Sequence, residues 1–399
     1  MTGAGARLTF LGTGTSQGVP IIGCQCEVCR SKDPRDKRFR ASALVEYQGL
    51  TILVDAGPDF RMQMLGQGVR HLDAILLTHN HKDHTGGLDD VRSLNYIDRR
   101  AAEIYCEKNV LEDLIREYPY VFKFPKYPGA PEWMLHVIDE KPFVIRKETA
   151  EKELVWVHDV GYHYRLPNGQ LIPTARSLDD MIDEAPKAVA ADVSLQSAKG
   201  AWAPGASRPI RVNGRPGALP PAANDGELAS GLASPDRSHP RLVRGRGPLA
   251  ERVGGAERSE ESGLSEPDDS AKSVESSATA VTIIPIRGLH DKLPVLGFRF
   301  GDIAYITDMS SIPESEFAKL EGLKHLTLNT VSYNTHHSHF SLQETLDLAD
   351  RIRPEHTWLT HLSHSFPVHE AFQKELERMC QEQHIHSIVR PAYDGLVIE

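Results

Sequence analysis

The sequence predicts an α/β fold in which two separated parts of the chain form one domain. Residues 1–145 and residues 281–399 both alternate short apolar runs with helical patterns and turn residues, as α/β domains do. Residues 146–280 differ, because Gly, Pro, Ser, Ala and charged residues dominate much of this stretch. We therefore interpret the middle part as an insertion into the domain.

Composition places the chain among globular proteins. The 399 residues have a hydrophobic fraction of 40%, a charged fraction of 25% and a net charge of -10, which excludes wholesale disorder. No apolar run approaches the ~18 residues of a membrane span, and residues 1–14 lack the pattern of a signal peptide. Five cysteines are too few for a disulfide framework. We expect a cytoplasmic protein with no membrane partner, and the acidic balance argues against indiscriminate binding of nucleic acid.

Apolar runs bounded by turn residues predict the strands, and helical spacing predicts the helices. The expected strands are Arg7–Gly12, Ala43–Tyr47, Leu50–Asp55, Ala74–Thr78, Val281–Ile286, Val295–Phe300, Ile303–Thr307, Leu326–Asn329 and Thr357–Thr360. The expected helices are Asp59–Leu65, Asp89–Ile97, Leu342–Ile352 and His369–Glu382.

The insertion is expected to contain one hairpin and one disordered stretch. Residues 154–172 have the pattern of a hairpin about Asn168-Gly169. From about Ala185 to Ala280 there is almost no aromatic residue after Trp202, and an arginine-rich half precedes an acidic half. Such a segment cannot bury enough apolar surface to offset its ordering entropy. We expect about 185–280 to have no stable structure.

A histidine-rich loop is the strongest chemical signal in the sequence. His79, His81, Asp83 and His84 lie within six residues, directly after the apolar run Ala74–Leu77. Imidazoles and carboxylates are ligands of Zn²⁺, Mn²⁺ and Fe²⁺. Four ligands at this spacing cannot all bind one ion without strain, so the loop predicts two adjacent metal sites.

Further ligands are expected from the last part of the chain, at the ends of predicted strands. His290 follows Val281–Ile286, Asp308 ends one predicted strand and His361 ends another. Neither part of the chain carries a complete set of ligands by itself, which favours one domain with an insertion over two domains.

These motifs resemble the binuclear hydrolases of the metallo-β-lactamase superfamily. The resemblance is closest to the phosphoribosyl cyclic phosphodiesterase group of the phosphonate-degradation pathway, and it covers 7–145 and 281–399 but none of the middle. Besides the metal loop, the motifs that carry it are Thr13-Gly14-Thr15-Ser16-Gln17-Gly18-Val19-Pro20, Cys24-Gln25-Cys26-Glu27-Val28-Cys29, Leu53-Val54-Asp55-Ala56-Gly57, Ser338-His339-Phe340 and Thr360-His361-Leu362-Ser363-His364.

The resemblance implies an αββα sandwich with two catalytic divalent ions, Zn or Mn, in a cleft at one edge of the sheets. It implies that one ion is held by His79, His81 and His290, the other by Asp83, His84 and His361, and that Asp308 bridges both. Asp55 would hold the histidine loop without touching metal.

The resemblance also implies a phosphodiesterase that cleaves a small, cyclic phosphodiester through a hydroxide shared by both ions. Asp308 would act in catalysis as the bridge, and His339 would donate a proton or stabilise the transition state. Because His336 and His337 are close neighbours of His339 in the sequence, the identity of the acting histidine stays open.

A cysteine cluster predicts a second kind of metal site. Cys24, Cys26 and Cys29 lie in one short turn, and three such thiolates form a metal knuckle that lacks one ligand. In the resembling family the fourth ligand corresponds to His364, which would complete a structural zinc site. We assign no role to Cys106 and Cys380.

Three other functions stay open at this point. A tRNA-maturing ribonuclease of the same superfamily is one, since the arginine-rich half of the insertion offers positive charge to RNA. A second is a non-catalytic carrier that resembles the quinone-cofactor biosynthesis protein of the superfamily. That protein has a degraded metal loop, whereas the metal loop of this chain is intact, which argues against this function. A glyoxalase-type thioesterase shares the same ligands. Nucleic acid is thus a partner that we do not favour, and the sequence leaves a homodimer open.

Overall fold

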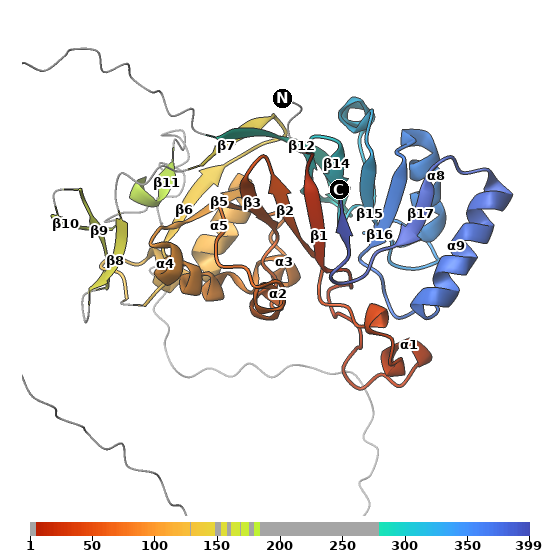
Figure 1. Ribbon diagram of the computed structural model, residues 1–399, viewed down its shortest axis with the longest axis horizontal. Helices are drawn as coiled ribbons and strands as arrows, with labels where there is room; N and C mark the ends of the chain where they lie inside the picture. Colours follow the sequence, from red (N-terminus) through yellow and green to blue (C-terminus); the bar gives the residue numbers. More distant parts are fainter. Residues whose placement is uncertain are drawn as a thin grey trace, which may run out of the picture. The chain divides into compact units, whose positions relative to one another are not determined.

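The computed structural model describes residues 5–127, 129–147, 153–157, 161–167, 169–174, 179–183 and 279–399. In this part of the chain, two β-sheets pack against each other, and helices cover the outer face of each sheet (Figure 1). This αββα sandwich confirms the predicted fold class. The stretch of about 185–280 that the sequence predicts to be disordered lies outside the described residues, apart from its last positions.

The first sheet is built from the first part of the chain, except for the two short strands at its edges, which come from the middle and last parts. Within the described ranges it has eight strands, and β3 to β6 run parallel while β1 to β3 are antiparallel. In spatial order they are β11 (Ile182–Asp183), β6 (Trp133–Val137), β5 (Ala102–Cys106), β4 (Ala74–Leu76), β3 (Leu50–Val54), β2 (Ser42–Tyr47), β1 (Arg7–Gly12) and β18 (Val397–Ile398).

The second sheet comes from the last part of the chain, with one strand from the first part. In spatial order its strands are β17 (Ile388–Pro391), β16 (His356–Thr360), β15 (His325–Asn329), β14 (Ile303–Tyr305), β13 (Leu293–Phe300), β12 (Ala280–His290) and β7 (Phe143–Arg146). The edge strand β7 pairs antiparallel with β12, so that Arg146 lies opposite Ala280. The residues that flank the expected insertion are therefore neighbours in one sheet.

The helices bury one face each and leave the other face in solvent. They are α1 (Glu27–Arg30), α2 (Phe60–Gln67), α3 (Lys82–Thr85), α4 (Arg92–Asp98), α5 (Lys108–Glu117), α6 (Pro119–Phe122), α8 (Leu342–Ile352) and α9 (His369–Gln383), with 3-10 turns at Pro34–Asp36, Leu88–Val91, Asp179–Met181 and Glu314–Leu320. Ser341 and Glu344 form a capping box that starts α8. Among the described residues, none of the helices is long and apolar enough to cross a membrane.

The main core lies between the two sheets and joins the two parts of the chain. Phe10 and Ile52 of the first sheet and Ile283, Phe298 and Trp358 of the second belong to one buried cluster. At roughly 25 cal/mol per Å² of apolar surface removed from water, such a cluster is the main stabilising term of the fold. The last part of the chain is therefore required to complete a core that the first part begins.

A small third sheet follows β7 in the sequence. Its strands are β8 (Glu153–Val157), β9 (Gly161–Arg165) and β10 (Leu171–Pro173). The antiparallel pair of β9 and β10 encloses Gly169, where the sequence predicts a hairpin turn, and β8 adds a strand on the other side of β9. The segment 154–172 thus contains three strands rather than the expected two.

Candidate metal centre

The histidine loop leaves β4 at Leu76 and runs into the short helix α3. Its ring centroids are close, at 4.6 Å between His79 and His81 and 4.2 Å between His79 and His84. Glycine at position 57 allows this loop to approach the segment after β3, since a Cβ there would lie 1.9 Å from the carbonyl oxygen of Asp83. The motif Asp55-Ala56-Gly57 and the histidine loop therefore pack as one unit.

Asp55 holds the histidine loop through hydrogen bonds. Its carboxylate accepts hydrogen bonds from the backbone N–H of Thr78 at 2.8 Å, from the Thr78 hydroxyl at 2.8 Å and from Nδ1 of His84 at 2.7 Å. Because the Thr78 hydroxyl donates to Asp55, its oxygen accepts from Nδ1 of His79, which lies 2.9 Å away. These contacts orient both rings so that Nε2 of His79 and Nε2 of His84 face the centre. They also leave Nε2 of His79 unprotonated.

The second sheet contributes His290, Asp308 and His361 at the ends of its strands. His290 is the last residue of β12, Asp308 follows β14 and His361 follows β16. Asp308 and His361 have positive φ angles of 56° and 57°, which are uncommon for residues other than glycine. Nδ1 of His290 donates to the carbonyl oxygen of Ser338 at 2.6 Å, so that its Nε2 is left as a free acceptor.

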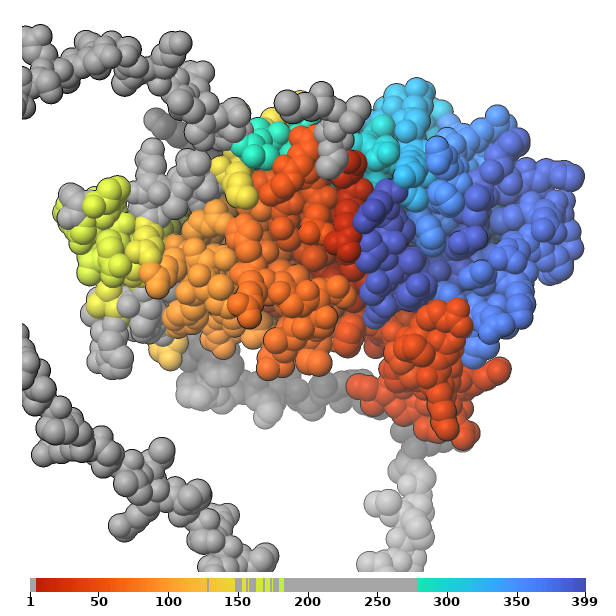
Figure 2. Space-filling view, viewed as in Figure 1, coloured from red at the N-terminus to blue at the C-terminus, as the bar shows by residue number. Residues whose placement is uncertain are grey.

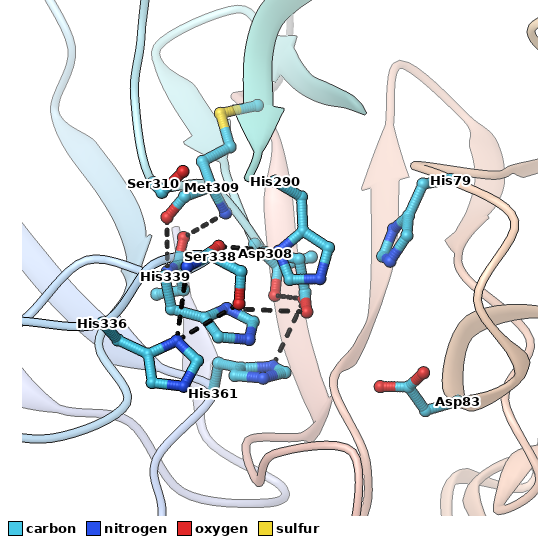
Figure 3. Close-up of polar contacts among 12 residues, drawn as sticks. His79, Asp83, His290, Asp308, Met309, Ser310, His336, Ser338, His339 and His361 are labelled. Carbon is cyan, nitrogen blue, oxygen red and sulfur yellow. Dashed lines mark hydrogen bonds and ion pairs between the residues drawn. The ribbon is translucent and has the colours of Figure 1, made fainter. Parts of the chain in front are cut away.

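Asp308 lies at the centre of the assembled side chains. Its Oδ2 is 3.3 Å from Nε2 of His84 and 3.2 Å from Nδ1 of His361, and its Oδ1 is 3.9 Å from Nδ1 of His339. In Figure 3, His290, His339 and His361 gather around Asp308, and His79 and Asp83 face them from the first sheet. The structure therefore brings all seven predicted metal ligands to the same edge of the sandwich.

Three groups of these side chains have ligand atoms within 4.8 Å of one another: His79, His81 and His290; His79, His84 and Asp308; and His290, Asp308 and His339. The first group is the set expected for one ion. In the set expected for the other, Asp83 and His84 are 3.3 Å apart, and His84 and His361 each contact Asp308. The third group was not expected, because the role predicted for His339 is that of a proton donor and not of a metal ligand.

Histidine ring nitrogens that lack a hydrogen bond among the described residues show whether this site fits a metal ion. The buried atoms Nε2 of His79, Nε2 of His84, Nδ1 of His339 and Nδ1 of His361 have no hydrogen-bond partner among the described residues. Buried polar atoms without partners are rare and costly in proteins. Divalent cations accept such nitrogen and carboxylate donors. The residues present therefore fit a metal ion.

The pKa shifts agree with this interpretation. Burial acts to raise the pKa of Asp308, but the His361 and His84 rings outweigh it and hold this pKa well below its ordinary value. Burial and the neighbouring His84 lower the pKa of His79 well below its ordinary value. An ionised carboxylate and a neutral imidazole are the forms that bind metal. Burial acts to lower the pKa of His84, but the carboxylates of Asp308, Asp55 and Asp83 outweigh it and raise this pKa. A bound cation would take the place of the proton that these carboxylates attract.

The cysteine cluster lies apart from this centre, in the segment that carries α1. Nδ1 of His364 is 3.2 Å from Sγ of Cys24, 3.5 Å from Sγ of Cys26 and 3.6 Å from Sγ of Cys29. None of these cysteines forms a disulfide. The backbone N–H of Cys29 lowers the pKa of Cys26 to about 6, which favours a thiolate. Figure 2 shows this segment, in red, projecting beside the blue C-terminal residues.

Two residues, Thr78 and Ser338, position the centre although the sequence predicts no such role for them. The Thr78 hydroxyl donates a hydrogen bond to Asp55 and accepts one from His79, so it links these two side chains. Its position between the buried strand and the first histidine could have indicated this role from the sequence. Ser338 holds His290 through its backbone carbonyl. Since every residue has a carbonyl, no residue type in the sequence could have marked this contact.

Comparison with known proteins indicates the family to which this chain belongs. The model of the beta-lactamase superfamily domain matches residues 51–152 and 248–362, more than half of the chain. Octanoyltransferase from Porphyromonas gingivalis is 28% identical over 392 residues, which are 98% of this chain and 51% of that protein. Ribonuclease Z from Bradyrhizobium diazoefficiens is 40% identical over 83 residues, which are 20% of this chain and 22% of that protein. The matches thus span about half or less of these relatives.

Among solved structures, a new diphosphatase from the PhnP family superposes with a TM-score of 0.57 and 24% identity. The superposition covers 99% of this chain and 97% of that chain. At this level of identity the likeness concerns the fold alone. The family match, the two-sheet fold and the ligand-bearing strand ends agree, and the chain belongs to the metallo-β-lactamase superfamily.

Proposed function

We propose that this chain is a metal-dependent hydrolase that cleaves a small phosphodiester at the centre around Asp308. The observation that carries the proposal is a set of buried imidazole nitrogens that make no hydrogen bond within the described ranges and converge on one buried carboxylate. Structural histidines normally satisfy both nitrogens, so this arrangement costs stability unless a cation occupies it.

Two divalent ions, Zn²⁺ or Mn²⁺, would be held by the predicted ligand set with Asp308 shared between them. The chemistry that such ions supply when bound is neutralisation of phosphodiester charge and activation of water. The chain's own residues orient this site: Asp55 and Thr78 hold His79 and His84, and the carbonyl of Ser338 holds His290. Because these supports are buried, the ligands are preorganised.

We assign to His339 the role of stabilising the leaving group. Burial and the nearby His361 lower the pKa of His339 to about 2, so the imidazole is neutral before substrate binds. A neutral imidazole can donate a hydrogen bond to the departing oxygen, and the negative charge of a bound phosphodiester would raise its pKa toward the range of a general acid.

A phosphorus-centred substrate is supported by the names of the similar proteins. A diphosphatase and ribonuclease Z both act at phosphorus, whereas the octanoyltransferase extends far beyond the matched region, so its name describes a larger protein. We propose a cyclic phosphodiester of ribose as the substrate within this class, on the strength of the sequence motifs around Cys24, Asp55 and His361.

An activity panel on metal-loaded protein tests the proposal. It compares a ribose cyclic phosphate, 2′,3′-cyclic nucleotides, bis(p-nitrophenyl) phosphate, a precursor tRNA and a thioester. We expect the diesters to be hydrolysed, and Asp308→Ala to lose most of this activity together with part of the metal. Parent-like diester hydrolysis by metal-loaded Asp308→Ala would show that the centre around Asp308 is not the active site.

A tRNA-maturing ribonuclease is the second candidate, favoured by the local match to ribonuclease Z. In the same panel, this function predicts cleavage of the precursor tRNA at a rate well above that of the small diesters. The opposite order of rates would exclude it.

We further propose that the cysteine cluster binds a structural zinc ion through three thiolates and His364. The close approach of all three sulfurs to one imidazole nitrogen supports this site. Cys26→Ser is expected to lose one zinc equivalent and to unfold at a markedly lower temperature, because a structural zinc contributes folding free energy. Elemental analysis and thermal unfolding measure both effects, and Cys380→Ser serves as the control. An unchanged zinc content in Cys26→Ser would contradict the site.

A further inference from the structure

The loop between β15 and α8 carries three histidines at the edge of the metal centre. Both ends of this loop are tied down: the N–H of Val331 donates to the carbonyl of Phe340, and the N–H of Phe340 donates to the carbonyl of Met309, next to Asp308. The backbone of the loop is therefore anchored beside the residue that follows the central carboxylate.

His336 is oriented by Ser338 of the same loop. Nδ1 of His336 lies 3.4 Å from the backbone N–H of Ser338 and 3.2 Å from its hydroxyl oxygen. A backbone N–H can only donate, so Nδ1 is the acceptor and the neutral ring carries its proton on Nε2. Burial and the neighbouring His337 lower the pKa of His336, which agrees with a neutral ring.

The position of His336 is intermediate between solvent and the reacting centre. Its ring centroid is 5.2 Å from that of His339 and 4.6 Å from that of His337. His336 is half-buried, whereas His337 is exposed. In Figure 3, the ring of His336 lies on the side of the cluster formed by His339 and His361, opposite His79 and Asp83. A substrate group that reaches beyond His339 would meet the Nε2–H donor of His336.

We propose that His336 is a specificity-determining residue that donates a hydrogen bond from Nε2 to an anionic phosphoryl oxygen. This inference rests on the proposed function, because it places a phosphate group at the Asp308 centre. The donor is a neutral imidazole held by Ser338, so its role is to bind and orient the phosphate rather than to transfer a proton. His337 shares its residue type and loop but faces solvent, and it provides a matched control.

The test measures binding of inorganic phosphate to metal-loaded protein by calorimetry, together with the kinetics of bis(p-nitrophenyl) phosphate hydrolysis. In His336→Ala we expect phosphate affinity to fall and KM to rise by roughly ten- to a hundred-fold, as for a lost hydrogen bond to a charged group. The value of kcat should change much less, and His337→Ala should match the parent. His336→Gln, whose amide retains a donor, should recover part of the affinity.

Elemental analysis and thermal unfolding of each variant verify that metal content and fold are retained. If the parent hydrolyses no diester but binds phosphate more tightly than His336→Ala, the proposed function fails and the assignment of His336 stands. If phosphate affinity and KM are the same in the parent and both variants, the assignment is wrong. A loss of kcat alone in His336→Ala, with affinity unchanged, would also overturn it, as would loss of metal.

Discussion

Two clusters of histidine and aspartate, one around Asp308 and one around His71, differ in how their nitrogens are satisfied. His71 has Asp73 2.9 Å from Nε2 and Asp98 3.0 Å from Nδ1, so a carboxylate faces each nitrogen. His84 has Asp55 2.7 Å from Nδ1, but its buried Nε2 lies 3.3 Å from both Asp83 and Asp308 and has no hydrogen-bond partner among the described residues. The first arrangement pairs both nitrogens with carboxylates at about hydrogen-bond distance, whereas the second leaves one nitrogen in longer contact with two carboxylates.

The comparison shows that residue types alone do not identify a metal site. Both clusters combine imidazole with carboxylates, and both raise the pKa of a histidine, that of His71 to about 9. What distinguishes them is that several buried nitrogens without a hydrogen-bond partner in the described part of the chain converge on one carboxylate. A protein tolerates that arrangement only where a ligand compensates for it.

His339→Ala should have the largest effect among the variants that sharpen the comparison. We expect the rate of diester hydrolysis to fall by ~10²-fold or more, as for loss of a general acid, with metal content unchanged. Steady-state kinetics and elemental analysis measure the two quantities. Because Nδ1 of His339 also lies within ligand distance of His290 and Asp308, loss of metal from this variant would make His339 a ligand and contradict the assigned role.

Asp55→Asn tests the buried support of the histidine loop. An asparagine cannot accept the hydrogen bonds from Thr78 and His84 with the same strength, so metal affinity should fall by roughly 10–100-fold. The matched control is Asp73→Asn, which alters a carboxylate of the His71 cluster and should leave metal affinity at the parent value. Competition with a chromogenic chelator gives both affinities. Equal losses in the two variants would erase the distinction between the clusters.

His71→Gln is expected to have the smallest effect of these variants. This effect should be on the free energy of unfolding and not on metal affinity. Asp73 and Asp98 raise the pKa of His71 from 6.5 to about 9 in the folded state. The stability from this pair is therefore fully present below about pH 6.5 and is lost as the pH rises through about 9. Since the side chain is 34% exposed, solvent screening keeps the effect modest.

Urea unfolding at pH 6 and at pH 9.5 measures this dependence. The difference in unfolding free energy between the parent and His71→Gln should shrink at the higher pH. His386→Gln, which removes an exposed histidine paired with Asp350, is the control and should show a smaller difference at both values. A difference for His71→Gln that is independent of pH would contradict the assigned charge pair.

Much of the fold was predictable because local patterns agree with the final structure. The predicted strands Arg7–Gly12 and Leu50–Asp55 are found as β1 and β3, and the predicted helix Leu342–Ile352 is found with the same bounds as α8. Strand ends were less accurate: β4 stops at Leu76, two residues early, and β12 continues to His290. The extension of β12 depends on pairing with β13, a long-range contact that no local pattern encodes.

The two halves of the metal centre also differed in how far they could be predicted. His79, His81, Asp83 and His84 form one compact motif, and their chemistry is visible in the sequence by itself. His290, Asp308 and His361 are isolated residues, and only their places at predicted strand ends and the family resemblance connected them to that motif. Their convergence requires β12, β14 and β16 to end at the edge where β4 ends.

The sequence by itself determined the α/β class, the composition of the histidine loop and the knuckle of three cysteines, because these depend on residue type and short-range spacing. Tertiary structure decided which nitrogens remain without partners, which carbonyl holds His290, and that His339 lies near enough to Asp308 to form a third group with His290. The physical reason is that these features depend on distances between side chains from different strands. Packing of the two sheets sets those distances, and chain-local preferences do not.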